Sequence, residues 1–156
     1  MFKNIRPALK NATTLHHVKK ELVKFLEITK NKNGNIKIGY VAGILNSDGP
    51  QHFESNRKKL ADYAEKLRKI HEFPIFSGVD IFSNEVYSRL EEWRLSLEEK
   101  EEKARLFWRE ILESGHITDI FMTPRWEKSK GANDEHETAK KIGLKIHYVG
   151  FDLLTA

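Results

Sequence analysis

The sequence predicts an α/β protein, a small three-layer sandwich with a mostly parallel sheet of about four or five strands. Short apolar runs of strand length alternate along the chain with longer stretches of helical periodicity. Residues 117–149 have the pattern strand, loop, helix, strand, which is typical of a right-handed parallel crossover. Residues 36–43 form a nearly continuous apolar run, as in a strand buried on both faces.

The N-terminal third is expected to contain one helix before the first strand. Residues 1–13 show no clear period and contain Pro7, so we expect a loose arm. Thr14 is placed to cap a helix over about residues 15–29, whose apolar positions form one stripe. Residues 36–43 are the first strand. The polar loop 44–50 then lies at that strand's C-terminal end, where substrate loops occur in parallel sheets.

The remaining elements follow the same alternation. A second helix is predicted over residues 51–71, and a second strand over 73–82 is followed by a loop that carries Asp80. A long helix, continuous or broken, is predicted over 84–114, with a charged middle that is either solvated or part of a subunit contact. The last helix, about 132–142, ends at Gly143. The order indicates a flavodoxin/Rossmann-like domain over residues 36–156, preceded by a basic arm and helix over 1–35.

Composition excludes several classes of site. The chain has no cysteine, which excludes disulfides, thiolate nucleophiles and Cys-based metal sites. The seven histidines are scattered and form no ligand spacing, so neither a metal nor a cofactor is expected. No apolar run approaches the roughly 18 residues of a membrane span, and the N-terminus lacks a signal-peptide core. We therefore expect a cytoplasmic protein with no membrane partner.

The net charge of +4 is concentrated near the N-terminus, where the first 37 residues hold nine lysine or arginine residues and only two acidic ones. A basic segment of this kind can bind nucleic acid. No aromatic or glycine-rich RNA motif accompanies it, however, so a solvated helix face is the favoured interpretation and nucleic-acid binding is the alternative.

One acidic residue of the last predicted helix lies on its apolar face. Ala132, Glu135, Ala139 and Ile142 share a helical face, and that face is expected to pack on the sheet. A carboxylate there, in the first turn, points toward the crevice beyond the strand ends, where ligands bind in open α/β sheets. The alternative is that Asp134 and Glu135 only complement the helix dipole.

The string WEKSKGANDE at residues 126–135, followed by Ala139 and Gly143, resembles a known signature, W-E-x-S-x-G-A-x-x-E-x-x-x-A-x-x-x-G. It is the signature of the nucleoside 2-deoxyribosyltransferase-like superfamily, and the chain is most similar to a branch catalogued mainly as a domain of unknown function. Residues 40–43 (YVAG) resemble its first-strand Y-x-x-G. Residues 109–111 (REI) and 118–119 (TD) resemble its R-D-I … C-D segment. The resemblance covers roughly residues 36–149.

This resemblance implies chemistry at an N-glycosidic bond. In such enzymes a glutamate attacks the anomeric carbon of a (deoxy)ribosyl group, and the matching residue is Glu135. Tyr40 matches the tyrosine that orients this carboxylate, although a purely structural strand tyrosine is the alternative. Glu110 matches an assisting aspartate, but it departs in residue type and in its spacing to Asp119. A surface glutamate on a charged helix is the alternative for Glu110.

The resemblance also implies a substrate-binding set. Ser129 matches a position that is serine in the nucleotide-hydrolysing members. Its hydroxyl and the backbone N–H groups up to Gly131 suit a phosphate at a helix N-terminus, which favours a nucleoside monophosphate. Arg125 and Lys130 add positive charge near that phosphate. Trp126 is placed either to stack on the base or to form a hydrophobic lid.

The other substrate-binding candidates are Gly43 and Ile44, where much of the branch has Gly-Pro, and Asp80, in the loop after the second strand. Transferases of this superfamily borrow a residue from a neighbouring subunit, which implies a homo-oligomer, a dimer or higher. The expected function is cleavage or transfer at the N-glycosidic bond of a nucleoside or nucleotide. A non-catalytic nucleotide-binding or nucleic-acid-associated module on the same fold is the alternative.

Overall fold

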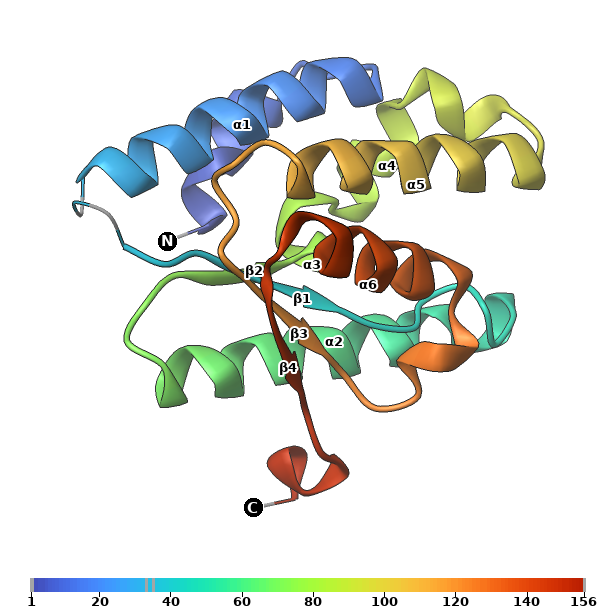
Figure 1. Ribbon diagram of the computed structural model, residues 1–156. Helices are drawn as coiled ribbons and strands as arrows, with labels where there is room; N and C mark the ends of the chain where they lie inside the picture. The colour runs from blue at the N-terminus through green and yellow to red at the C-terminus, as the bar shows by residue number, and fades with distance from the viewer. Residues whose placement is uncertain (1, 33, 35, 156) are drawn as a thin grey trace.

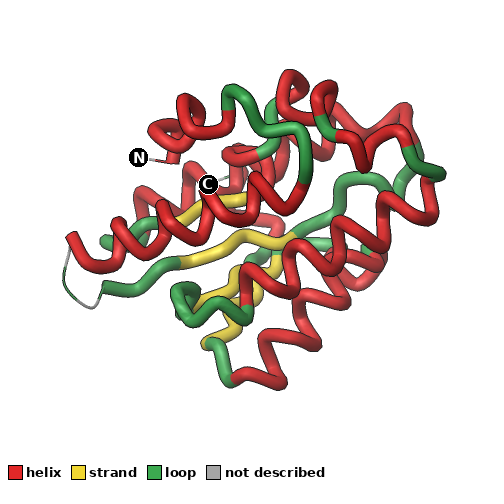
Figure 2. Tube along the Cα trace, turned by 90° about the horizontal axis from the view of Figure 1, so that it is seen from above, coloured by secondary structure: helices red, strands yellow, loops and turns green. Residues whose placement is uncertain are grey.

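The computed structural model describes residues 2–32, 34 and 36–155 of the chain and confirms the α/β class. Its centre is a four-stranded sheet in the order β2-β1-β3-β4, in which every strand is parallel to its neighbours (Figure 1). Seen from above, the strands lie in the middle of the molecule (Figure 2). The strands are β1 (Gly39–Ala42), β2 (Ile75–Ser77), β3 (Asp119–Met122) and β4 (Lys145–Tyr148).

Helices cover both faces of the sheet. Helix α2 (Phe53–Ile70) lies on one face, and α5 (Leu97–Leu112) and α6 (Lys130–Ile142) lie on the other (Figure 1). Helix α1 (Leu15–Lys32) packs on the outer side of α5. The shorter helical segments are η1 (Phe2–Leu9), η2 (Pro50–His52), α3 (Gly78–Ile81), α4 (Asn84–Arg89), η3 (Glu91–Arg94), η4 (Trp126–Lys128) and η5 (Phe151–Leu154). No helix in the described part of the chain is long and apolar enough to cross a membrane.

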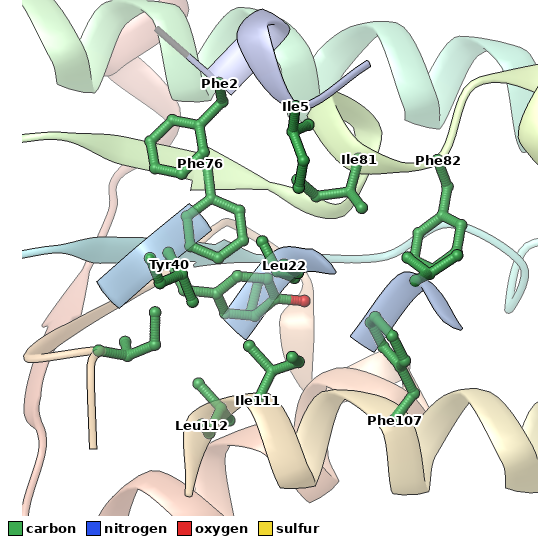
Figure 3. Packing of buried hydrophobic residues seen from close by; sticks show 14 of the residues in the cluster. Phe2, Ile5, Leu22, Tyr40, Phe76, Ile81, Phe82, Phe107, Ile111 and Leu112 are labelled. Carbon is green, nitrogen blue, oxygen red and sulfur yellow. The ribbon is translucent and has the colours of Figure 1, made fainter. Parts of the chain in front are cut away.

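Alternation along the strands gives the sheet two hydrophobic cores. Val41 and Phe121 face α2 and pack with its Leu60 and Leu67. Tyr40 belongs to the core on the opposite face, which contains residues of β2, α5 and α1 (Figure 3). Because neighbouring strand residues point to opposite faces, the tyrosine of β1 is directed toward the α5–α6 layer.

The strand order also fixes where a ligand site can form. The chain leaves β1 for α2 on one face, and it leaves β3 for α6 on the other face. Since β1 and β3 are neighbours and parallel, the two departing loops separate at the same edge of the sheet. Ligands of open α/β sheets bind in the crevice at such a switch point.

The expected loose arm is wrong for residues 2–9. Phe2–Leu9 forms the 3₁₀ helix η1, and Phe2, Ile5 and Leu9 are buried against the core. The Phe2 ring stacks on Phe76 of β2 at 4.7 Å between centroids. The apolar spacing of about three residues suits a 3₁₀ helix, which tolerates Pro7, but the segment is too short to show a clear period.

This packing predicts a stability effect at Ile5, which is 1% exposed. Ile5→Val is expected to lower the free energy of unfolding by about 1 kcal/mol, because the removal of one buried methylene group leaves a small cavity. The matched control is Ile28→Val on α1, where the side chain is 55% exposed and the change is expected to be close to zero. Urea denaturation measures both, and equal effects at the two positions would contradict the packing of η1.

The long helix predicted over residues 84–114 is broken, one of the two forms expected. Ser83 and Ser96 each accept a hydrogen bond from the backbone three residues on and start α4 and α5. The strand predicted over 73–82 is too long. It ends at Ser77, because Ser77 and Asp80 form a capping box that starts α3.

Candidate active site

A hydrogen bond between β1 and α6 joins the two residues on which the sequence argument depends. The Tyr40 hydroxyl donates to Oε1 of Glu135 at 2.7 Å. Glu135 is 7% exposed and Tyr40 is 4% exposed. The Ser129 hydroxyl accepts from the backbone N–H of Ala132 at 3.1 Å, which starts α6 one turn and a half before Glu135. The cap and the strand together therefore fix the position of the carboxyl group.

Burial dominates the electrostatics of this pair. It raises the pKa of Glu135 to about 8, against a weaker lowering by the Tyr40 hydrogen bond and a further rise from the charge of Asp134. Burial, followed by the nearby charge of Glu135, raises the pKa of Tyr40 well above its usual value. The carboxyl group of the ligand-free protein is thus mostly protonated at neutral pH and ionises a little above it.

Asp134 is held away from this pair by an ion pair with α5. The Arg109 guanidinium donates to both carboxylate oxygens of Asp134, at 2.6 and 3.3 Å. The neighbouring acidic residues of α6 therefore have different environments: Asp134 is paired with a cation, whereas Glu135 is buried beside a hydroxyl. Only the second arrangement leaves a carboxyl group at a cavity.

Tyr40 and Glu135 both line a cavity of about 450 Å³ at the switch point of the sheet. This volume is within the range of small-molecule sites. The loop after β1 contributes Gly43 and Leu45, and the start of α6 contributes its cap Ser129 and Gly131. The cavity is therefore in the crevice where the topology places a ligand.

Aromatic rings form the side of the cavity next to Tyr40. Trp108 of α5 stacks on Tyr40 at 4.9 Å between centroids, and Trp93 stacks on Tyr87 at 4.7 Å. Gly78 makes room for Trp108, because a Cβ at this position would lie 3.1 Å from the indole ring. These rings give the cavity an aromatic, apolar wall against which a flat ring can pack.

Charged groups also line the cavity. Lys128 of η4 and Lys130 at the start of α6 lie on either side of Ser129 in the chain, and Glu101 and Arg105 come from α5. Among the described residues, no group of three or more histidine and acidic side chains is arranged to hold a metal ion.

The structure brings part of the predicted substrate-binding set together and places the rest elsewhere. Gly43, Ser129 and Gly131 line the cavity with Tyr40 and Glu135. Ile44 and Arg125 line a different, smaller cavity of about 170 Å³ on the α2 side.

Arg125 and Trp126 have structural partners outside the cavity that contains Glu135. Arg125 is bound to Asp48 at 2.8 Å, which ties together the loops after β1 and β3. The Trp126 ring stacks on His136 at 4.3 Å between centroids.

Asp80 and Glu110 are likewise engaged elsewhere. Asp80 accepts from Arg68 at 2.6 Å and from the backbone N–H of Ser77 at 2.8 Å. Glu110 forms an ion pair with Lys19 of α1. Neither carboxylate lines the cavity that contains Glu135, so the structure offers no contact through which Glu110 assists there.

Sequence reasoning missed the contribution of α5 to the cavity. Glu101, Arg105 and Trp108 are spaced i, i+4 and i+7, and they share one helical face. That spacing was a usable signal, but it is hidden in a run of glutamates that resembles a solvated helix. Tyr87 and Trp93 have no local signal, because α4 and η3 reach the cavity only through the fold.

Comparison with known proteins adds a family of unknown function. No curated protein and no solved structure matches the chain. Residues 83–148, less than half of the chain, match a family model described as a domain of unknown function, DUF4406. The matched segment runs from α4 to β4 and includes Glu135, whereas Tyr40 lies outside it.

Proposed function

We propose that Glu135 is the nucleophile of an enzyme that cleaves or transfers the N-glycosidic bond of a (deoxy)nucleoside or nucleoside monophosphate. The observation that carries the proposal is the buried Tyr40–Glu135 hydrogen bond at a cavity in the switch point of the sheet. The proposal places the chain in the nucleoside 2-deoxyribosyltransferase-like superfamily. The resemblance of residues 126–135 to that superfamily's signature supports the assignment.

The reaction has two steps. The ionised Glu135 carboxylate attacks C1′ of the sugar, the C1′–N bond breaks, and the base leaves with the bonding electrons and takes a proton from water. Water then attacks C1′, which restores the carboxylate and releases the sugar. A second base in place of water makes the reaction a transfer. Tyr40 holds Oε1, and no described residue donates a hydrogen bond to Oε2, so Oε2 is the attacking atom.

A phosphate on the substrate fits the opposite side of the cavity. Gly131 lies in the first turn of α6, where backbone N–H groups and the helix dipole favour an anion. The side chains of Lys128 and Lys130 add two positive charges there. The favoured substrate is therefore a nucleoside monophosphate rather than a nucleoside.

A mass-spectrometric screen for freed base tests this proposal. The protein is incubated with ribo- and deoxynucleosides and their 5′-monophosphates, and we expect free base from at least one monophosphate. If monophosphates raise the melting temperature without releasing base, the chain is the alternative, a non-catalytic nucleotide-binding module. If no compound is cleaved, the enzymatic proposal is wrong.

Tyr40→Phe is expected to slow base release by roughly 10- to 100-fold, because a hydrogen bond to a charged group is lost. The Tyr40 hydrogen bond lowers the pKa of Glu135, so its removal also moves the pH dependence of kcat/KM upward from a midpoint near 8. Initial rates between pH 6 and 10 measure both effects. Tyr148→Phe is the control, because that hydroxyl bonds His136 and lies outside the cavity. A Tyr40→Phe profile that keeps its midpoint would contradict the role of the hydroxyl.

A further inference from the structure

One face of α5 lines the cavity with an acidic, a basic and an aromatic side chain. Trp108 lies against Tyr40, and Arg105 and Glu101 follow about one and two helical turns toward the start of α5. Because side chains at i, i+4 and i+7 share a face, the three groups line the cavity in a row. The row begins beside the Tyr40–Glu135 pair.

Neither charged group of this row has a side-chain partner among the described residues. Glu101 and Arg105 are both half-buried, and neither forms an ion pair or hydrogen bond with another described residue. Their spacing would permit an ion pair with each other, yet none is formed. Two half-buried carboxylates outside the cavity do have partners: Asp134 binds Arg109 and Asp48 binds Arg125. Because both groups of the row line the cavity without a protein partner, both are available to bind a ligand there.

The chemistry of the two groups restricts that ligand. A carboxylate only accepts hydrogen bonds, and a guanidinium only donates them in a fixed fork. Guanine offers two adjacent N–H donors, N1–H and N2–H, to a carboxylate, and two acceptors, O6 and N7, to a guanidinium. Adenine, cytosine and uracil lack the paired donors. Trp93, Tyr87 and Trp108 line the same cavity and give this side an aromatic surface against which a base can pack.

We infer that the α5 side of the cavity is a guanine subsite, in which Glu101 accepts from N1–H and N2–H and Arg105 donates to O6 and N7. This inference rests on the proposed function for the position of the sugar at Glu135. It identifies the leaving group as guanine, and it makes Glu101 and Arg105 the residues that determine base specificity.

Binding of the four common deoxynucleoside monophosphates, measured by isothermal titration calorimetry, tests the subsite. The measurements use the Glu135→Gln protein, so that turnover does not interfere. We expect dGMP to bind at least about tenfold more tightly than dAMP, dCMP or dTMP. Glu101→Gln in that background is expected to weaken dGMP binding about tenfold and to leave dAMP binding unchanged. The matched control is Glu102→Gln, which alters an exposed neighbour outside the cavity.

The outcomes separate this inference from the proposed function. Equal affinities for the four nucleotides, or an unchanged dGMP affinity in Glu101→Gln, overturn the guanine subsite. Release of only non-guanine bases by the wild-type protein also overturns it, while the glycosidase proposal stands. Preferential dGMP binding that depends on Glu101 supports the subsite even if no base is released, and in that case only the proposed function fails.

Discussion

Glu135→Gln is expected to slow base release by at least about 10³-fold while the protein stays folded. Glutamine has nearly the same shape, and its amide oxygen accepts the Tyr40 hydroxyl in place of Oε1. The amide carries no negative charge and cannot form the glycosyl ester, so the covalent step is lost. Single-turnover measurements of freed base, with the substrate found in the screen, quantify the loss.

Glu137→Gln is the matched control for this experiment. Glu137 is an exposed residue of the same helix, and it forms a loose ion pair with Lys140 at 4.0 Å. The rate of this variant is expected to equal that of the wild type. If Glu135→Gln kept more than about a tenth of the wild-type rate, Glu135 would not be the nucleophile.

Local sequence signals predict the helical face on which Glu135 lies, whereas Tyr40 was predicted from the resemblance of residues 40–43 to a first-strand motif. The helix that carries Glu135 is bounded by a serine cap and a glycine stop, so the side of α6 on which the carboxyl lies follows from helical periodicity. Tyr40 lies in a four-residue strand that is buried on both faces, and strand alternation then sets the side on which the ring lies. Sequence alone did not give their distance of 2.7 Å, because they are 95 residues apart.

Signals that depend on long-range packing were misread or invisible. Glu110 matched an expected position along the chain, yet α1 packs on α5 and supplies Lys19 as its partner. Asp80 followed a predicted strand, but the strand ends early and the carboxylate caps α3 instead. The charged row of α5 lines the cavity together with Tyr87 of α4 and Trp93 of η3. Lys19 and Glu110 are 91 residues apart in sequence, so no local pattern predicts their ion pair.

Glu135 should also make the stability of the protein depend on pH. Its pKa is about 8 in the folded protein and near the ordinary 4.5 in the unfolded chain. Below pH 4.5 the carboxyl is protonated in both states, and the full stability is present. As the pH rises toward 8, the unfolded state loses the proton while the folded state keeps it. The free energy of unfolding therefore falls, by an amount on the order of 4 kcal/mol, and levels off above the folded pKa.

Glu135→Gln removes this dependence, so its stability relative to wild type is expected to increase with pH. Urea denaturation at pH 5, 7 and 9 measures the free energy of unfolding of both proteins. The variant and the wild type should differ little at pH 5 and by several kcal/mol at pH 9. The free energy of unfolding of Glu137→Gln should equal that of the wild type at all three pH values. If the free energies of unfolding of wild type and Glu135→Gln changed in parallel with pH, the Glu135 carboxyl would ionise in the folded protein as it does in water. A gain in stability together with a loss of base release is the expected behaviour of a buried carboxyl that serves chemistry at a cost to the fold.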